Sequence, residues 1–405
     1  MNQTTTCITI DVSQGKSHIQ GFISLDRPLG KAKRMRHTKQ GYEQIITLIN
    51  IIKSKTATIP LVVLEYTGIY HKSLEKFLVG RGIIYHLVAP LRAANARNSE
   101  IRNQKTDARD CLSLAKMFYS NNLGEFVSEN KDYAKLRKLN RIYEINLNHI
   151  IKIKFNLREA LAILYPNYDD LFLNVYSDVS LTFLKNFPHS DKFLNKSKKQ
   201  IINILLKEWN HLEDWTINKI AEIYPFVIEN VSGCDEDDPD VQMLISYIEQ
   251  LEYYIHQNDE ILKNMIKLAK NTTLYPLIYS LPGVKDNLTA RLIAELGDIN
   301  RFNNYKSIVA YGGIDPMIRQ SGDYEGLHLR ISRKGNRRFR SLLYLIVNSM
   351  IKSNRAPSAI RDYYQKKTQQ VNPLKPKAAS IACANKLVRI IYYMHKTGSL
   401  YTYKE

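Results

Sequence analysis

The start of the chain alternates between strand-like and helix-like segments, and carboxylates end two of the strand-like ones. Short apolar segments at 7–12 and 18–25 indicate a hairpin, and 59–65 reads as a buried strand. Asp11 and Glu65 stand at the ends of the first and third of these segments. Because strands alternate with helices over about 120 residues, we expect an α/β fold built on a mixed, five-stranded sheet.

Two further acids follow on a predicted helix. Asp107 and Asp110 are three residues apart in the helical segment 105–120, so they share one helix face. Each acid alone has an ordinary explanation, as a turn former, a helix cap or a partner of the helix dipole. Four acids brought together would repel one another without a cation. Oxygen ligands suit Mg²⁺ or Mn²⁺, so the pattern with Asp11 and Glu65 predicts a divalent-metal site.

The chain is strongly basic. Its 58 Lys and Arg against 39 Asp and Glu give a net charge of +19, which favours a polyanionic partner such as nucleic acid over a merely basic protein. Four scattered cysteines without a C-x-x-C pair indicate reduced thiols, not a disulfide framework or a zinc site. We find no secretory signal, and the longest apolar stretch, 342–350, is too short for a bilayer, so we expect a cytoplasmic protein without a membrane partner.

Residues 121–270 form a helical, charged middle region. The segment 231–240 is polar and acidic, and reads as a linker. After it, 241–270 runs without Gly or Pro and repeats apolar residues at helical spacing. Two interpretations stay open: a coiled coil or dimer arm, and an amphipathic helix that packs within its own domain.

Residues 271–405 form a third, mainly helical part. The segment 279–299 resembles a helix-hairpin-helix element, in which a tight turn presents backbone N–H groups to a phosphate. Lys285 stands where such a turn often has a second glycine, and its ammonium group can reach a phosphate. The alternative is a simple turn between helices.

A loop and a basic cluster follow this element. Ser321 lies in a Gly-flanked loop, where a hydroxyl becomes a nucleophile only if a base, a metal or nearby cations activate it. Most Ser-Gly pairs are turns, so this serine carries little weight by itself. Guanidinium groups suit bidentate phosphate contacts. The candidate phosphate-binding residues of the cluster are Arg319, Arg330, Arg333, Lys334 and Arg337.

The order of these blocks matches a known family. IDVSQGK, LEYTGIY and NQKTDARDCLSLAK are followed by LPGV, YGGIDP, QSG and ISRKGNRRFR. This series resembles the DEDD-type insertion-sequence transposases (insertion-sequence family one-ten), which include bridge-RNA-guided recombinases and related pilin-gene invertases. The resemblance covers both ends of the chain, about 1–120 and 270–390.

The resemblance implies a RuvC-like, ribonuclease-H-like domain over 1–120, a helical or coiled-coil region over 121–270 and a transposase domain over 271–405. It implies a metal-binding tetrad of Asp11, Glu65, Asp107 and Asp110, and a catalytic serine at Ser321. In such enzymes the serine attacks a DNA phosphate with Mg²⁺ assistance and forms a phosphoserine intermediate, in a composite site that often joins two subunits. The implied partners are DNA at the element ends and target, a structured guide RNA, and further copies of the chain in a dimer or tetramer.

We therefore expect a DNA transposase or recombinase of a mobile element. The alternatives are a DNA invertase of the same family and a metal-dependent, RuvC-like junction nuclease that uses water and leaves Ser321 structural. A non-catalytic nucleic-acid-binding protein is a third alternative. A tyrosine recombinase is disfavoured because the sequence offers no convincing Arg/His/Arg/Tyr constellation.

Overall fold

The chain separates into two compact units, Met1–Ser128 and Glu129–Glu405. The expected boundary near 270 falls inside the second unit. The computed structural model describes residues 5–65, 68–88, 92–93, 107–123, 130–209, 211–317, 320–321, 324–325, 330–353 and 356–403.

The first unit contains a mixed, six-stranded sheet in the order β3-β2-β1-β5-β6, with β4 also paired to β2. The predicted hairpin is confirmed, since β1 and β2 are antiparallel, while β5 lies parallel to both β1 and β6. The sequence predicted five strands; β4 was missed because its sequence KRMR has one apolar residue, Met35. The elements are β1 (Cys7–Ser13), β2 (Lys16–Ser24), β3 (Arg27–Pro28), β4 (Lys33–Arg36), α1 (Lys39–Thr56), β5 (Leu61–Glu65), α2 (Lys72–Gly80), β6 (Tyr85–Val88) and α4 (Asp107–Tyr119).

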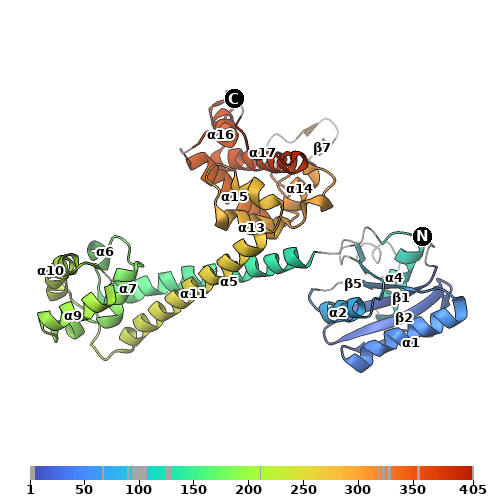
Figure 1. The fold of residues 1–405 in the computed structure, drawn as a ribbon, viewed down its shortest axis with the longest axis horizontal. Coiled ribbons are helices and arrows are strands. Elements are labelled where there is room, and N and C mark those ends of the chain that lie inside the picture. The colour runs from blue at the N-terminus through green and yellow to red at the C-terminus, as the bar shows by residue number, and fades with distance from the viewer. Residues whose placement is uncertain are drawn as a thin grey trace. The chain divides into compact units, whose positions relative to one another are not determined.

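Helices cover the two faces of this sheet (Figure 1). Because side chains alternate along a strand, Ile8 and Ile10 of β1 pack under α1 and α2, whereas Cys7 packs on the other face with α4 residues such as Leu114. Thr38 caps α1 by accepting a hydrogen bond from the backbone N–H of Gly41. The face covered by α4 also carries the candidate acids described below.

Two long helices, α5 and α11, run side by side in the second unit and carry a small helical bundle near one end (Figure 1). Residues of both helices join the aromatic core of this bundle, which includes Tyr165, Phe183 and Phe187. The elements are α5 (Lys131–Leu164), α6 (Tyr168–Leu171), α7 (Asp178–Asn186), α8 (Ser190–Leu194), α9 (Lys198–Trp209), α10 (Glu213–Glu229) and α11 (Pro239–Lys270).

The remaining helices form a second core with the other ends of α5 and α11. Leu136 of α5 and Met265 of α11 are fully buried in it, among apolar residues of α13, α15 and α17. The elements are α12 (Leu274–Tyr279), α13 (Asp286–Leu296), the 3-10 helix η1 (Ile299–Arg301), α14 (Tyr305–Gly312), β7 (Gln320–Ser321), β8 (Tyr324–Glu325), α15 (Arg337–Lys352), α16 (Ala359–Gln369) and α17 (Pro376–Thr397).

The structure gives α11 an intramolecular partner. Its buried residues Val241, Leu244, Ile248 and Leu251 follow the spacing of a coiled-coil seam, and the helix packs along α5. This is the second of the two interpretations of the middle region, a helix that packs within its own domain. The acidic segment before α11 lies within the same unit, as the loop between α10 and α11.

Candidate active site

Two of the four predicted acids lie at the same edge of the sheet. In the parallel pair β1–β5, Ile10 lies opposite Leu64, so the next positions, Asp11 and Glu65, are neighbours at the carboxyl ends of the strands. Both are one position away from residues packed under α1 and α2, so both belong to the α4 face. Glu65 is only 5% exposed, and Asp11 is partly buried.

Helix α4 brings a third acid to this face. Cys111 of α4 donates its S–H to the backbone oxygen of His18, 3.3 Å away on β2. Burial raises the pKa of the Cys111 thiol to about 12, and the charges of Asp11 and Asp110 oppose its ionisation further. Asp110 is 5% exposed. One thiol therefore lies within electrostatic reach of acids from two separate elements.

Asp107 is the first residue of α4, one turn before Asp110, and its side chain lies outside the described part of the structure. The three described acids offer carboxylate oxygens from β1, β5 and α4 on one face. Such a donor set fits a hard divalent cation, whose charge offsets the repulsion among partly desolvated carboxylates. Among the described residues, the carboxylates of Asp11, Glu65 and Asp110 are not gathered within 4.8 Å of one another, and binding of Mg²⁺ or Mn²⁺ by these acids stays a prediction.

Ser321 lies in a short hairpin of the second unit. It ends β7 and pairs with Tyr324 of the antiparallel strand β8. The structure describes the backbone of Ser321 but not its side chain, and Arg319 lies outside the described residues.

The basic segment after this hairpin is exposed and held by backbone contacts. Arg333 has a left-handed backbone conformation (φ 54°), and its N–H donates to the oxygen of Gly313 at 3.1 Å. A Cβ at Gly313 would lie 2.9 Å from the Arg333 backbone, so this close approach requires glycine. Burial lowers the pKa of Arg340, and so do the positive charges of Arg333 and Arg337. The predicted phosphate-binding residues Arg330, Arg333, Lys334 and Arg337 are all exposed.

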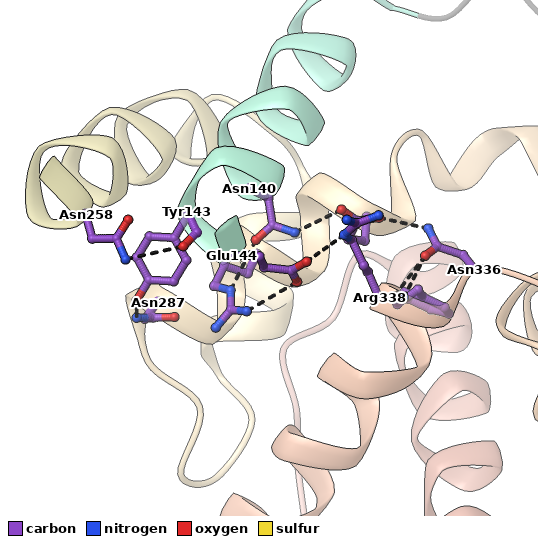
Figure 2. Close-up of polar contacts among 10 residues, drawn as sticks. Asn140, Tyr143, Glu144, Asn258, Asn287, Asn336 and Arg338 are labelled. Carbon is purple, nitrogen blue, oxygen red and sulfur yellow. Dashed lines mark hydrogen bonds and ion pairs between the residues drawn. The ribbon is translucent and has the colours of Figure 1, made fainter. Parts of the chain in front are cut away.

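A buried polar network holds the end of this segment against α5 (Figure 2). The side-chain N–H₂ of Asn336 donates to Glu295 Oε2 at 2.8 Å and to the Tyr311 hydroxyl at 2.9 Å. The other carboxyl oxygen of Glu295 accepts from Asn140 of α5 at 2.9 Å. Asn140 and Glu295 are both fully buried, and the Asn336 carbonyl caps α15. The basic segment is thus anchored where α15 begins.

A second row of ion pairs lies beside this network. Glu144 of α5 accepts from Arg338 Nε at 2.6 Å and from Arg291 Nη2 at 3.4 Å, and Arg291 also donates to Asn140 (Figure 2). Sequence reasoning missed these residues. The available signal was Asn140, a polar residue at an apolar position of the α5 repeat, four residues after Leu136.

Lys285 is exposed and precedes α13, in the turn of the predicted helix-hairpin-helix element. Its ammonium nitrogen lies 5.3 Å from the centre of the Tyr279 ring. Gly283 in the same turn has φ +73°, and its carbonyl accepts from the Ser349 hydroxyl at 2.5 Å. The two helices and a glycine-dependent turn are present; phosphate binding by this turn stays a prediction.

A different acidic group lies at the start of α11. Cys234, Asp238 and Asp240 each place one potential ligand atom within 4.8 Å of the others. Asp238 already caps α11 by accepting from the Asp240 N–H, and the positive end of the helix dipole disfavours a cation there. Burial also raises the pKa of the Cys234 thiol, which opposes a thiolate ligand. We therefore assign this group to helix capping.

Comparisons with known proteins match both units. A family model described as a transposase, of the DEDD type of insertion sequence IS110, matches residues 8–166. A second model, described as the transposase IS116/IS110/IS902 family, matches residues 275–365. The chain belongs to this family of insertion-sequence transposases.

Two relatives come from insertion elements of Streptomyces. An uncharacterized 44.8 kDa protein of insertion element IS116 from Streptomyces clavuligerus is 29% identical over 126 residues, or 31% of this chain and 30% of the relative. An uncharacterized 43.6 kDa protein of insertion element IS110 from Streptomyces coelicolor is 26% identical over 149 residues, or 36% of this chain and 35% of the relative. The matched part spans about a third of each relative. Across the described residues, no helix has the length and apolar character needed to cross a membrane.

Proposed function

We propose that the protein is a DNA transposase that cuts and rejoins the DNA of a mobile element through a phosphoserine intermediate. The observation that carries the proposal is that Asp11 and Glu65 are neighbours at the ends of two parallel strands, on the sheet face that α4 with Asp110 covers, in a chain of a transposase family. We propose that these acids and Asp107 hold Mg²⁺ or Mn²⁺. A bound divalent cation would polarise the reacting phosphate and offset the charge that develops there.

We propose Ser321 as the nucleophile. Its oxygen forms a bond to phosphorus, one ester bond of the DNA backbone breaks, and the departing DNA oxygen takes up a proton while the serine hydroxyl loses one. Because the new ester retains the energy of a phosphodiester, a second DNA hydroxyl can displace the serine and reseal the strand. Water as the nucleophile would leave the strand cut.

The exposed cations supply the second part of the proposal. Phosphates of the DNA would be bound by Lys285, by Arg319 and by the cluster of Arg330, Arg333, Lys334 and Arg337. We also propose a structured guide RNA and a dimer or tetramer of the chain as partners, on the basis of the family. The enzyme would act on cellular DNA in the cytoplasm.

The test is strand cleavage by the full chain on DNA that carries the element ends, in Mg²⁺. Asp11→Asn, Glu65→Gln, Asp107→Asn and Asp110→Asn should each abolish cleavage without unfolding the protein, because each removes a charged oxygen ligand with little change in shape. Asp26→Asn is the matched control, since Asp26 is an exposed acid in a turn of the same unit. Cleavage near the wild-type level by two of the four variants would remove the acids from the mechanism.

A junction nuclease is the second candidate. The observation in its favour is that all three described acids lie in the first unit, so hydrolysis by a metal-activated water needs no residue of the second unit. Its products would be cut strands with no protein attached. A DNA invertase would share the whole mechanism of the transposase and differ only in the DNA sites that it joins.

A further inference from the structure

The first unit carries an exposed group of cations beside the acids. Residues 27–39 contain six Lys or Arg and no acid. Three exposed cations, Lys16 of β2 with Arg34 and Arg36 of β4, lie on adjacent paired strands. We call these three residues the basic edge.

The register places the basic edge on the same face as the acids. Met35 of β4 is fully buried with the core under α1, so Arg34 and Arg36 belong to the opposite face. On β2, Ile19 packs with that same core, which assigns Lys16 and His18 to the opposite face as well. That opposite face is the one covered by α4, where Asp11 and Glu65 lie.

One row of paired residues across neighbouring strands connects the basic edge with the acids. Arg34 lies opposite His18, and His18 lies opposite Asp11. Asp11 in turn neighbours Glu65 across β1–β5. Since paired strands are separated by about 5 Å, Arg34 is about 10 Å from Asp11 along the row. That separation is short enough for one DNA strand to reach both the basic edge and the acids.

No contact within the described part of the chain explains why three cations lie together at the basic edge. Lys16 lies directly opposite Arg36, and like charges at directly opposed positions of a sheet are destabilising. No acid of the described residues forms an ion pair with Lys16, Arg34 or Arg36. Charged side chains often protect an edge strand from pairing with another chain. That explanation fails for Lys16, because β2 is paired on both sides at this position.

We propose that Lys16, Arg34 and Arg36 bind backbone phosphates of the DNA strand close to the phosphate that reacts at the acids. The proposal rests on the proposed function, since it takes the acids as the site of reaction. DNA is favoured over RNA because the row of paired residues ends at the acids, where the reacting strand must pass. A bound polyanion would also remove the repulsion between Lys16 and Arg36.

The experiment compares two triple variants of the full chain. Lys16→Gln, Arg34→Gln and Arg36→Gln together remove the basic edge. Lys33→Gln, Lys53→Gln and Lys55→Gln are the matched control: they remove the same charge from exposed positions on β4 and α1, with Lys33 on the opposite face of β4. Binding of element-end DNA alone, and of RNA alone, is measured against salt concentration in both.

Loss of the basic edge should weaken DNA binding and reduce the slope of log K against log salt by about 2–3, because each lost phosphate contact removes about 0.9 released counterions. The control should leave the slope near that of the wild type. The melting temperature of the basic-edge variant should equal or exceed that of the wild type, since a like-charge pair is gone.

Three outcomes would overturn the proposal: equal slopes in the two variants, a slope change for RNA without one for DNA, or a lower melting temperature of the basic-edge variant. Binding is measured without cleavage, so the result stands apart from the proposed function. A wild-type chain that binds DNA through this edge but never cuts it would contradict only the proposed function.

Discussion

Replacing Asn336 by alanine removes the residue that links the basic segment to the buried network. Its side-chain carbonyl accepts from the backbone N–H groups of Arg338 and Phe339, which caps α15. Its N–H₂ group donates to Glu295 and Tyr311. Asn336→Ala therefore removes a helix cap and leaves one carboxyl oxygen of the fully buried Glu295 without its donor.

The two losses have separate magnitudes. The cap contributes about 1 kcal/mol, and a buried acceptor left without its partner costs about 1–3 kcal/mol. We expect the free energy of unfolding to fall by about 2–4 kcal/mol. For a unit of this size the melting temperature should fall by about 3–7 °C. Calorimetry of the full chain measures the shift. Both tryptophans lie in the second unit, so their fluorescence identifies the transition that belongs to it.

Two further variants separate the cap from the network. Asn304 caps α14 by accepting from the Ser307 N–H at 3.0 Å and is exposed, so Asn304→Ala should cost only about 1 kcal/mol. Asn336→Asp keeps a good cap but puts a second carboxyl group against Glu295, so it should cost at least as much as Asn336→Ala. An Asn336→Asp variant as stable as the wild type would refute the role of the buried network.

Three other perturbations test the rest of the structure. In the native chain a thiol reagent should modify Cys234 alone, because the other three cysteines are buried. Modification of more than one thiol before unfolding would contradict the burial of Cys7, Cys111 and Cys383. Gly283→Ala should lower the melting temperature, because φ is +73° and the new Cβ would lie 2.9 Å from a backbone oxygen, whereas Gly80→Ala meets nothing within 4 Å and should be neutral or slightly stabilising. Neutralising three exposed cations of the basic segment together should flatten the salt dependence of nucleic-acid binding, and an unchanged slope would mean that these side chains face solvent and bind no phosphate. These cations are Arg333, Lys334 and Arg337.

The sequence predicted those elements of the fold that depend on residues close together in the chain. The hairpin of β1 and β2 and the strand β5 follow from the spacing of apolar residues. The acids were also visible, because strand ends and a three-residue helical spacing are local features. Asp11 and Glu65 could be predicted to meet once β1 and β5 were taken as parallel neighbours.

Features that join distant residues could not be predicted in this way. The segment that forms β4 has one apolar residue, and only its pairing with β2 places Arg34 and Arg36 beside the acids. Asn140 and Glu295 are 155 residues apart in sequence, so no local pattern shows that they form a hydrogen bond. For α11, the apolar spacing predicted that one face of the helix is buried. The same spacing does not say whether the partner is α5 or a helix of a second chain.

The measurement that tests the central claim most directly is the covalent state of the DNA after cleavage. Incubation of the full chain with labelled element-end DNA and Mg²⁺ should yield a protein–DNA adduct that survives denaturation and maps to Ser321. Ser321→Ala should lose the adduct and strand exchange but still bind DNA, since only one hydroxyl is removed. Ser332 is the matched control: its hydroxyl donates to Asp315 at 2.8 Å, and Ser332→Ala should still form the adduct. Wild-type cleavage by Ser321→Ala, or an adduct that maps to a tyrosine, would contradict the account.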